Sequence, residues 1–305
     1  MGKATEKDNK RGSVMNTSLS VITVTHNSAH IVRGALAGLP PGVEIVCVDN
    51  ASADDLSAAL EGLAVHRIDN AANFGFGRAC NIGAAAASGE YLLFMNPDVR
   101  IGPEAIDALL LAAERYPNCG VFVPRTNTAD GRLWFREQSE IDRLFGAPLP
   151  TRIRQVWGDC CIRFVNGGVF MIKRTLFLAM GGFDEDIFLY FEDDDLSHRL
   201  LQRKEPLILV NDAHAVHDVG MSVAQSTRSR IFRHRSKMRS EIHLRRKYGI
   251  AYHPVADIVR YSAKIGFYSL IFNRNRLINS LGRLIGIFDW ILDRSQADRN
   301  RRHAA

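Results

Sequence analysis

The sequence predicts an α/β fold in which a mostly parallel sheet carries helices on both faces. Two observations support this prediction. Short β-branched runs alternate with helical segments at a spacing that is typical of parallel βαβ units. The runs also end at polar, helix-capping clusters, such as His26-Asn27-Ser28 after the first of them.

The first run, over 19–25, is rich in β-branched residues and predicts a strand. The same reasoning predicts helices over 31–39, after Ser52 and over 76–87, and strands over 43–48, 65–68 and 91–94. Further on it predicts a helix near Pro103, a connecting loop over 135–155, a strand over 165–172 and a short helix over 176–180. From Thr227 onward the composition is that of Arg-rich helices.

Charge is distributed unevenly along the 305 residues. Residues 225–305 hold 18 Lys and Arg against 5 Asp and Glu, a net of +13, whereas the preceding residues hold 21 against 28, a net of −7. We therefore expect a disordered tail over 1–18, an α/β domain over 19–226 and a basic helical region over 227–305.

The five cysteines show no C-x-x-C spacing and are odd in number, which favours reduced thiols of a cytoplasmic protein over a disulfide framework. The polar N-terminal residues resemble neither a signal peptide nor an anchor. No apolar run reaches the ~18 residues that a membrane span needs.

Four consecutive carboxylates, Glu192 to Asp195, follow the aromatic residues Phe188, Tyr190 and Phe191 and open a predicted helix. Crowded carboxylates raise one another's pKa, which leaves one of them able to accept a proton near neutral pH as a general base. The alternative is structural, because acidic residues in a first helical turn stabilise the helix dipole and cap free N–H groups. The motif by itself leaves both interpretations open.

Polar residues also follow the predicted strands, at the edge where parallel sheets bind ligands. Asp98, in Asn96-Pro97-Asp98, has the chemistry to hold a divalent cation that neutralises a diphosphate, although an ordinary turn is the simpler account of this tripeptide. Asp49 is placed to bind a base or ribose hydroxyl, or to cap a helix. His217 is a metal ligand or a structural histidine.

The glycines at 75, 77 and 83 mark places where the backbone turns sharply or approaches a ligand, which alone is weak evidence. The order and spacing of seven segments are more specific. Together they resemble family 2 glycosyltransferases of the GT-A fold, and within that family the bacterial rhamnosyltransferases that act on lipid-linked glycans. The segments, spread over about 19–248, are 21–27, 48–52, 73–81, 89–98, 181–185, 190–196 and 217–222.

The resemblance implies a donor site built from strand ends and a glycine-containing turn. Its members are Thr25, Asn27 and Asp49 in the nucleotide pocket, Asn73, Gly75 and Gly77 beside the sugar nucleotide with Asn81 as a buttress, and Asn96 and Asp98 at the diphosphate.

The resemblance also assigns the catalytic and metal-binding positions. Asp193 matches the general base of the family, with Glu192 as its partner. Asp98 fills the last position of the family's Asp-x-Asp, whose first position is Asn96 here, so Mg²⁺ or Mn²⁺ finds one anionic ligand fewer. His217 matches a histidine that completes the metal shell in some relatives.

The implied reaction is an inverting transfer of a hexose from a nucleotide-diphospho-sugar to a hydroxyl of a polyprenyl-diphosphate-linked or polysaccharide acceptor. L-Rhamnose from dTDP-rhamnose is the first expectation. The alternatives are a UDP-sugar donor (GlcNAc, galactose or galactofuranose) and an inactive sugar-nucleotide-binding scaffold. A nucleotidylyltransferase would need a Gly-rich, basic loop after the first strand, where this chain has Thr25-His26-Asn27-Ser28.

The basic C-terminal region carries an apolar stripe at helical spacing between Leu277 and Leu292. One interpretation is a helix that lies on the anionic inner face of the cytoplasmic membrane, where a polyprenyl acceptor resides. The other is packing on the domain or on a second subunit of a homo-oligomer. Nucleic-acid binding is not expected, because no recognition motif accompanies the basic residues.

Overall fold

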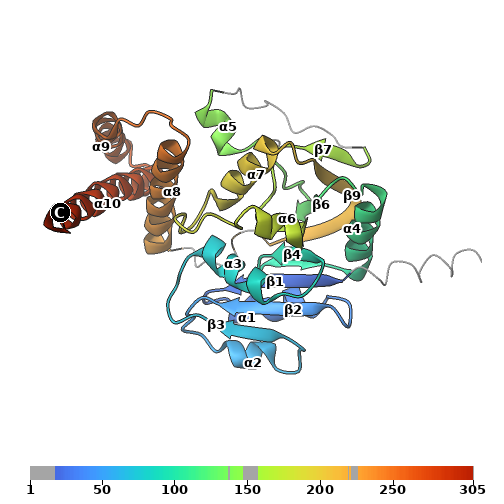
Figure 1. The fold of residues 1–305 in the computed structure, drawn as a ribbon. Coiled ribbons are helices and arrows are strands. Elements are labelled where there is room, and N and C mark those ends of the chain that lie inside the picture. Colours follow the sequence, from blue (N-terminus) through green and yellow to red (C-terminus); the bar gives the residue numbers. More distant parts are fainter. Residues whose placement is uncertain (1–17, 137, 147–156, 219, 221–225, 305) are drawn as a thin grey trace, which may run out of the picture. The chain divides into compact units, whose positions relative to one another are not determined.

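The computed structural model describes residues 18–136, 138–146, 157–218, 220 and 226–304, the last eleven of them as backbone only (Figure 1). The predicted N-terminal tail over 1–18 lies almost wholly outside the described residues. The chain forms two compact units: residues 1–185 with 192–222, here called the sheet unit, and residues 186–191 with 223–305, here called the helical unit.

The sheet unit is built on one sheet with the strand order β3-β2-β1-β4-β8-β6-β9-β5, and β7 pairs with β9. The first four positions, β3 to β4, are joined by parallel pairs, as predicted from the βαβ spacing. Strand β8 pairs antiparallel with both β4 and β6, and strands β5 and β7 each pair antiparallel with β9. The strands are β1 (Leu19–Thr25), β2 (Glu44–Asp49), β3 (His66–Asp69), β4 (Tyr91–Met95), β5 (Val99–Ile101), β6 (Val121–Thr128), β7 (Cys160–Ile162), β8 (Val169–Lys173) and β9 (Leu207–His217).

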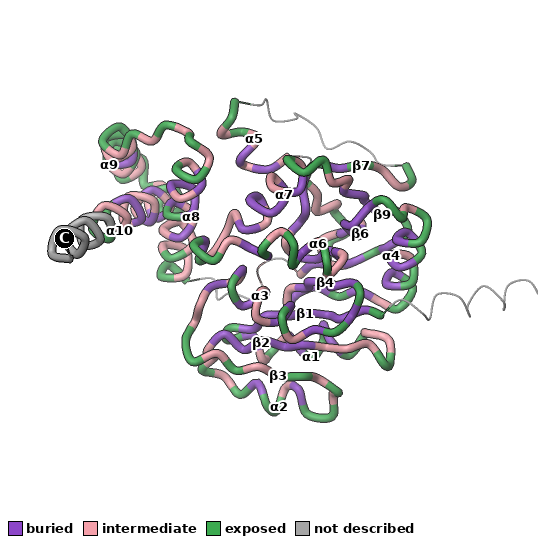
Figure 2. Tube along the Cα trace, in the orientation of Figure 1, coloured by how far each residue is buried: buried purple, intermediate pink, exposed green. Residues whose placement is uncertain are grey.

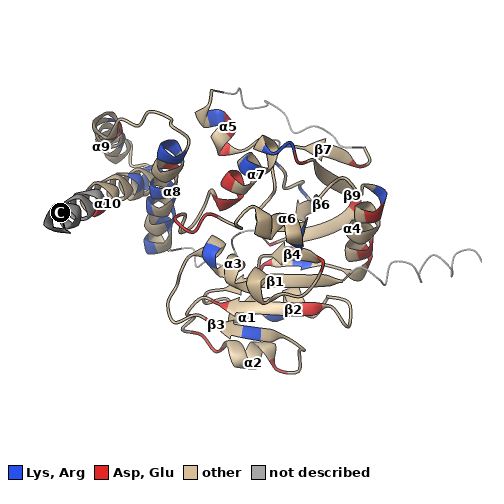
Figure 3. Cartoon of the chain, in the orientation of Figure 1, with Lys and Arg blue, Asp and Glu red and all other residues tan. Residues whose placement is uncertain are grey.

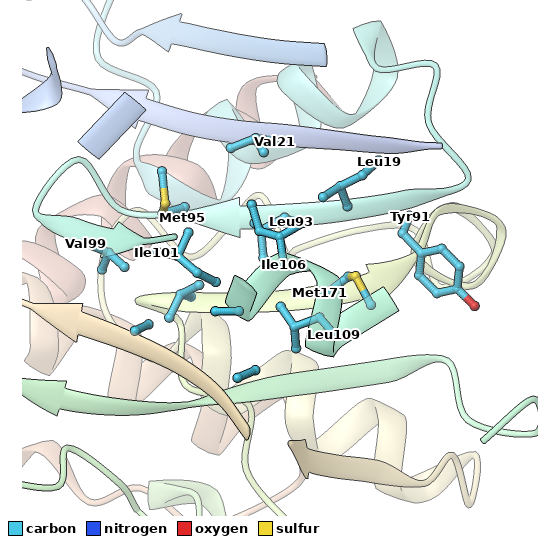
Figure 4. Packing of buried hydrophobic residues seen from close by; sticks show 14 of the residues in the cluster. Leu19, Val21, Tyr91, Leu93, Met95, Val99, Ile101, Ile106, Leu109 and Met171 are labelled. Atoms are coloured by element: carbon cyan, nitrogen blue, oxygen red, sulfur yellow. The ribbon is translucent and has the colours of Figure 1, made fainter. Parts of the chain in front are cut away.

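Helices cover both faces of this sheet, because successive strand residues point to opposite sides and both sides are apolar. On one face Val21 and Leu93 pack with α1, α2 and α4, and Figure 4 shows Leu93 meeting Ile106 of α4 and Met171 of β8. On the other face Ile22 packs with α3, α6 and α7. These helices are α1 (Ala29–Leu36), α2 (Leu56–Leu60), α3 (Phe76–Ala86), α4 (Pro103–Arg115), α6 (Arg174–Ala179) and α7 (Glu192–Gln202).

One expectation about a loop was wrong. Within the segment 135–155 the structure has a short helix, α5 (Glu140–Leu144). Ser139 accepts a hydrogen bond from the Asp142 N–H, and the Asp142 side chain accepts one from the Ser139 N–H, which is a capping box. The capping box stabilises the start of this helix, although the weak hydrophobic periodicity of the segment had indicated a loop. Residues 147–156 lie outside the described part of the chain.

The helical unit consists of α8 (Thr227–Lys247), α9 (Pro254–Leu270) and α10 (Arg274–Ala304). Its core is formed by Met238, Ile242, Tyr261 and Ile287, all of them buried. Leu284 and Ile291 of the apolar stripe predicted over 277–292 pack against this core, while Phe288 and Leu292 of the same stripe are exposed. Among the described residues no helix is both long and apolar enough to cross a bilayer.

The segment 186–191 joins this helical unit although it lies far from α8 in sequence. The Leu189 carbonyl accepts a hydrogen bond from Ser240 Oγ at 2.9 Å. Phe188 packs edge-on against Phe232, and the Lys237 ammonium lies 4.9 Å from the centre of the Tyr190 ring. Residues just before α7 are thus held by α8.

Helices α8 and α10 approach closely at two glycines one helical turn apart. A Cβ atom on Gly286 would lie 2.6 Å from the Arg235 carbonyl oxygen and 2.9 Å from Met238 Cβ. A Cβ atom on Gly282 would lie 2.7 Å from the Ile231 carbonyl oxygen. Only a residue without a side chain permits this contact.

We expect Gly286→Ala to lower the free energy of unfolding by about 1–3 kcal/mol, because the added methyl group overpacks a backbone contact. Gly266→Ala in α9 is the matched control, since its Cβ would meet nothing within 4 Å. That change should be neutral or stabilise the protein by up to ~1 kcal/mol. Denaturant unfolding measures both, and equal stability of the two variants would contradict the close packing.

Candidate active site

The parallel register brings the ends of β1 and β2 together, with Thr25 opposite Asp49. Thr25 Oγ1 donates to Asp49 Oδ1 at 3.4 Å, and the Ser52 N–H donates to the same oxygen at 3.2 Å. Asp49 Oδ2 faces the Arg67 guanidinium at 3.6 Å. Asp49 does not cap a helix, because α2 is capped by Asp55. Its carboxylate is therefore fixed at the strand end.

Asn27 ties the two loops that follow these strands to each other. It adopts a left-handed conformation with φ of 56°, which asparagine tolerates. Its N–H donates to Ser52 Oγ at 2.9 Å, and its side-chain oxygen accepts from the Ala53 N–H at 2.7 Å. Asn27 is exposed, so it lies at the surface beside the ends of β1 and β2.

Asn50, next to Asp49, organises the glycine-containing turn and was not among the predicted site residues. Its side-chain nitrogen donates to Asn73 Oδ1 at 2.9 Å and to the Gly75 carbonyl at 3.1 Å. Its oxygen accepts from the Phe74 N–H at 3.0 Å. Asn50 is buried, and these partners lie 23 to 25 residues further along the chain, so no local sequence pattern indicates its role.

The turn continues into α3, where Gly77 lies against two other segments. A Cβ atom on Gly77 would lie 2.9 Å from Phe183 Cβ and 3.6 Å from Glu192 Cβ, so the start of α3 packs on the start of α7. Gly75 has a φ of 88°, which favours glycine. Asn81 donates to the Phe183 carbonyl at 2.9 Å and accepts from the Phe183 N–H at 2.8 Å, so it holds the 181–185 turn.

Asp98 and His217 form a buried pair between the ends of β4 and β9. Asp98 Oδ1 lies 3.1 Å from His217 Nε2. The Trp134 ring packs edge-on against the imidazole at 4.1 Å between ring centres, and Gly168 lies against both rings. The other imidazole nitrogen, His217 Nδ1, lacks a hydrogen-bond partner among the described residues, and so does Oδ1 of Asn96, two residues before Asp98. A buried carboxylate and an imidazole with an unused nitrogen fit a divalent cation.

Asp193 stands in the first turn of α7 and is only half-buried. One of its oxygens accepts from the Gly167 N–H at 3.2 Å and the other from the Asp194 N–H at 3.0 Å. Because Gly167 contacts Asp193 and the next residue, Gly168, contacts His217, the structure brings the predicted base and the predicted metal ligands together on one turn.

Two other carboxylates of the cluster, Asp194 and Asp195, are engaged in structural contacts. Asp195, fully buried, pairs with Arg199 at 2.7 Å, and Arg199 donates to the carbonyls of Met180 and Gly182. Asp194 accepts from the Arg136 guanidinium at 3.0 Å and from the Glu140 N–H. Burial, and after it the Asp193 charge, raises the pKa of Asp194 to about 7. The crowding expected from the sequence thus acts on Asp194.

The sequence model described as "Glycosyl transferase family 2" matches residues 20–181, more than half of the chain. The chain belongs to this family. Among curated proteins, this glycosyltransferase is 28% identical over 256 residues to an N-acetylglucosaminyl-diphospho-decaprenol L-rhamnosyltransferase of Mycobacterium tuberculosis, with 72% of the chain and 82% of the relative covered. It is 25% identical over 191 residues to the low-salt glycan biosynthesis hexosyltransferase Agl10 of Haloferax volcanii, with 61% and 62% covered.

Solved structures share its fold. The mannosyltransferase PcManGT of Pyrobaculum calidifontis, in complex with GDP-Man and Mn²⁺, matches with a TM-score of 0.53 at 17% identity, covering 90% of this glycosyltransferase and 88% of that chain. GalNAc-T7 with UDP, GalNAc and Mn²⁺ matches with a TM-score of 0.51 at 19% identity over 67% of this chain, which spans only 44% of GalNAc-T7. The predicted GT-A fold is confirmed, and the protein is an inverting glycosyltransferase that uses a nucleotide-sugar donor.

The raised pKa of Asp194 leads to an expected pH effect on the stability of the glycosyltransferase. A carboxyl group whose folded-state pKa is raised from 3.8 to about 7 contributes stability that is complete below pH 3.8 and is lost as the pH rises through 7. Asp194→Asn cannot ionise. The melting temperature of Asp194→Asn minus that of wild type should therefore increase as the pH is raised from about 4 to 7. The same difference for the exposed control Asp212→Asn should stay constant. A constant difference across this range would refute the assignment.

Proposed function

We propose that this glycosyltransferase transfers L-rhamnose from dTDP-β-L-rhamnose to a hydroxyl of a polyprenyl-diphosphate-linked sugar. The observation that carries the proposal is the similarity to the mycobacterial rhamnosyltransferase over 82% of that protein, whose name gives a decaprenyl-diphosphate-linked N-acetylglucosamine as acceptor. The site geometry supports it, because the carboxylates and the imidazole that such a transfer needs lie together.

In this proposal Asp193 is the general base. It takes the proton from the acceptor hydroxyl while that oxygen attacks the anomeric carbon from the face opposite the leaving nucleoside diphosphate, which inverts the configuration and gives an α-L-rhamnoside. Its half-exposed position and its two backbone N–H donors keep the carboxylate oriented and accessible. Glu192, buried at the start of α7, supports its placement.

The donor would bind at the ends of β1 and β2. Thr25, Asn27 and Asp49 would bind the nucleoside, and the turn of Asn73, Gly75 and Gly77 would form the wall beside the sugar. Asp98 and His217, with Asn96 next to them in the motif, would hold Mg²⁺ or Mn²⁺. When bound, the cation would supply charge neutralisation at the leaving diphosphate.

The location that follows is peripheral, on the inner face of the cytoplasmic membrane. A polyprenyl-diphosphate acceptor stays in the bilayer, so the enzyme has to reach it there. The basic helical unit is the part suited to an anionic surface, and Figure 3 shows Lys and Arg at several turns of α8.

The second candidate donor is a UDP-sugar. The TarS residues 1–349 crystallised with UDP-GlcNAc match this fold with a TM-score of 0.53 at 15% identity. An inactive scaffold is disfavoured by the joint presence of Asp98, Asp193 and His217 at one site.

A donor screen distinguishes these functions. Purified enzyme with Mn²⁺ and a short-chain polyprenyl-diphosphate-GlcNAc acceptor would be given dTDP-rhamnose, UDP-GlcNAc, UDP-galactose, UDP-galactofuranose or GDP-mannose. We expect nucleoside-diphosphate release and a glycolipid product with dTDP-rhamnose. Preference for a UDP-sugar would replace rhamnose as the donor, and no turnover with any donor would support the scaffold.

A further inference from the structure

Helix α9 is apolar on two opposite sides. Its inner side contributes Tyr261, which is buried, and Ile258 to the core of the helical unit. Its outer side carries Val255, Val259, Phe267 and Leu270, which are 71%, 63%, 56% and 79% exposed. At 3.6 residues per turn these four side chains share an arc of about 120°. Ala256, Ala263 and Gly266 occupy the same arc, so no polar residue interrupts it.

Much of α9 is accordingly coloured as exposed in Figure 2. A surface helix normally places polar residues opposite its apolar stripe, and a helix that is apolar on both sides is covered on both. Contiguous exposed apolar surface of this kind marks an interaction site. The outer side of α9 therefore needs a partner.

The tip between α9 and α10 is an independent sign of such a partner. Phe272 is 93% exposed and adopts a left-handed conformation with φ of 52°. The Asn273 N–H donates to the Tyr268 carbonyl at 2.9 Å, so Phe272 takes the position after the helix end where glycine is preferred. A bulky aromatic side chain there costs backbone strain and exposes apolar surface at the same time.

The charges around this surface indicate what the partner is. Residues 254–276 contain four basic residues and one acidic residue, a net of +3. The acidic residue, Asp257, is paired with Arg260 at 2.8 Å. Lys264 borders the apolar arc, and Arg274 and Arg276 follow the tip. A symmetric dimer through this face would bring the same positive charges together, which is unfavourable. An anionic lipid surface complements them.

We propose that α9 lies in the headgroup region of an anionic bilayer, with its outer side and the 271–272 tip inserted and Lys264, Arg274 and Arg276 against lipid phosphates. This inference rests on the proposed lipid-linked acceptor and names the docking surface. It also shifts the main docking surface from the 277–292 stripe to α9, since Ile278 of that stripe is buried and Leu284 and Ile291 pack against the core of the unit.

The test is binding of the full-length protein to vesicles. Wild type should bind vesicles of equal parts phosphatidylglycerol and phosphatidylethanolamine and bind phosphatidylcholine vesicles at least ~10-fold more weakly. Leu270→Ser/Phe272→Ser should weaken binding by ~10-fold or more. Arg274→Gln/Arg276→Gln should weaken it ~10-fold at low salt and little at high salt. The matched control is Leu111→Ser/Leu178→Ser, which removes two exposed leucines from the sheet unit and should bind as wild type does.

Phe272→Gly separates docking from folding. Glycine relieves the left-handed strain, so this variant should melt at or above the wild-type temperature while binding vesicles more weakly. Wild-type vesicle binding by the variants at 270, 272, 274 and 276 would overturn the proposal. So would a wild-type dimer that Leu270→Ser/Phe272→Ser dissociates in the absence of lipid. Transfer to a water-soluble acceptor should remain unchanged in all these variants, so a wrong donor or acceptor would be recognised independently of the docking result.

Discussion

Asp193→Asn is expected to lower turnover by about 100-fold or more, the usual scale for removal of a general base, while donor binding stays close to wild type. The substitution keeps the shape of the side chain and its acceptor oxygen but removes the ability to take a proton. Turnover is measured as nucleoside-diphosphate release, and binding by calorimetric titration with the nucleoside diphosphate and Mn²⁺.

The control is the neighbouring Asp194→Asn. Asp194 is 2% exposed and is held by Arg136 and the Glu140 N–H, so it cannot reach an acceptor hydroxyl. This variant should keep turnover within about 10-fold of wild type, in contrast to the loss expected for the base. Near wild-type turnover in Asp193→Asn together with a dead Asp194→Asn would show that the base had been misassigned.

Removal of the divalent cation should abolish transfer, and Asp98→Asn should raise the Mn²⁺ concentration needed for half-maximal rate by ~10-fold or more. The reason is that Asp98 is the anionic ligand of the proposed metal site, while the first position of the motif is an uncharged Asn96. The measurement is the transfer rate in EDTA and during titration with Mn²⁺ or Mg²⁺.

His217→Ala and His214→Ala make a matched pair for the same site. Both histidines lie on β9, but His217 is buried beside Asp98 and His214 is exposed. Only His217→Ala should change the metal dependence. Full activity of the wild-type enzyme in EDTA would show that the cation is not part of the mechanism. Basic side chains would then have to stabilise the charge of the leaving diphosphate.

The first half of the fold could be predicted from sequence because each of its elements carries a local signal. The strand predicted over 19–25 coincides with β1, and the helix predicted over 76–87 ends one residue beyond α3. The carboxyl ends of parallel strands meet at one edge of the sheet, so the order of strands and helices along the chain is enough to place Thr25, Asp49 and Asp98 there.

Two later strands, β6 and β9, lack such signals. β6 contains Pro124, which normally argues against a strand inside a sheet, and the structure accommodates it at a shift in register against β9. In β9, Asn211 and Asp212 interrupt the apolar run that would have identified it. His217 was therefore recognised by its motif. Its contact with Asp98 depends on the pairing of β9 with β5, which puts His217 opposite Val99 and which no local pattern shows.

The roles within the acidic cluster were also only partly predictable. The crowding argument is sound in general, but which carboxyl group keeps its proton depends on burial. Asp194 is buried against Arg136, in the segment after β6, whereas Asp193 is half-exposed. Periodicity alone does not predict which of two adjacent residues in a first helical turn is buried. Asn50 was missed for a similar reason, since its partners lie more than 20 residues away.

The placement of residues 186–191 in the helical unit bears on how this enzyme could be recombined with its relatives. The chain leaves the sheet unit after Glu185, returns at Glu192 and leaves again after Ser222, so a C-terminal cut does not separate the two units. A chimera that exchanges only 223–305 would place a foreign α8 against the native Phe188, Leu189 and Tyr190. These residues come just before α7, which contains Asp193 in its first turn. Functional exchange of the helical unit between family members should therefore require residues 186–191 and 223–305 to be transplanted together.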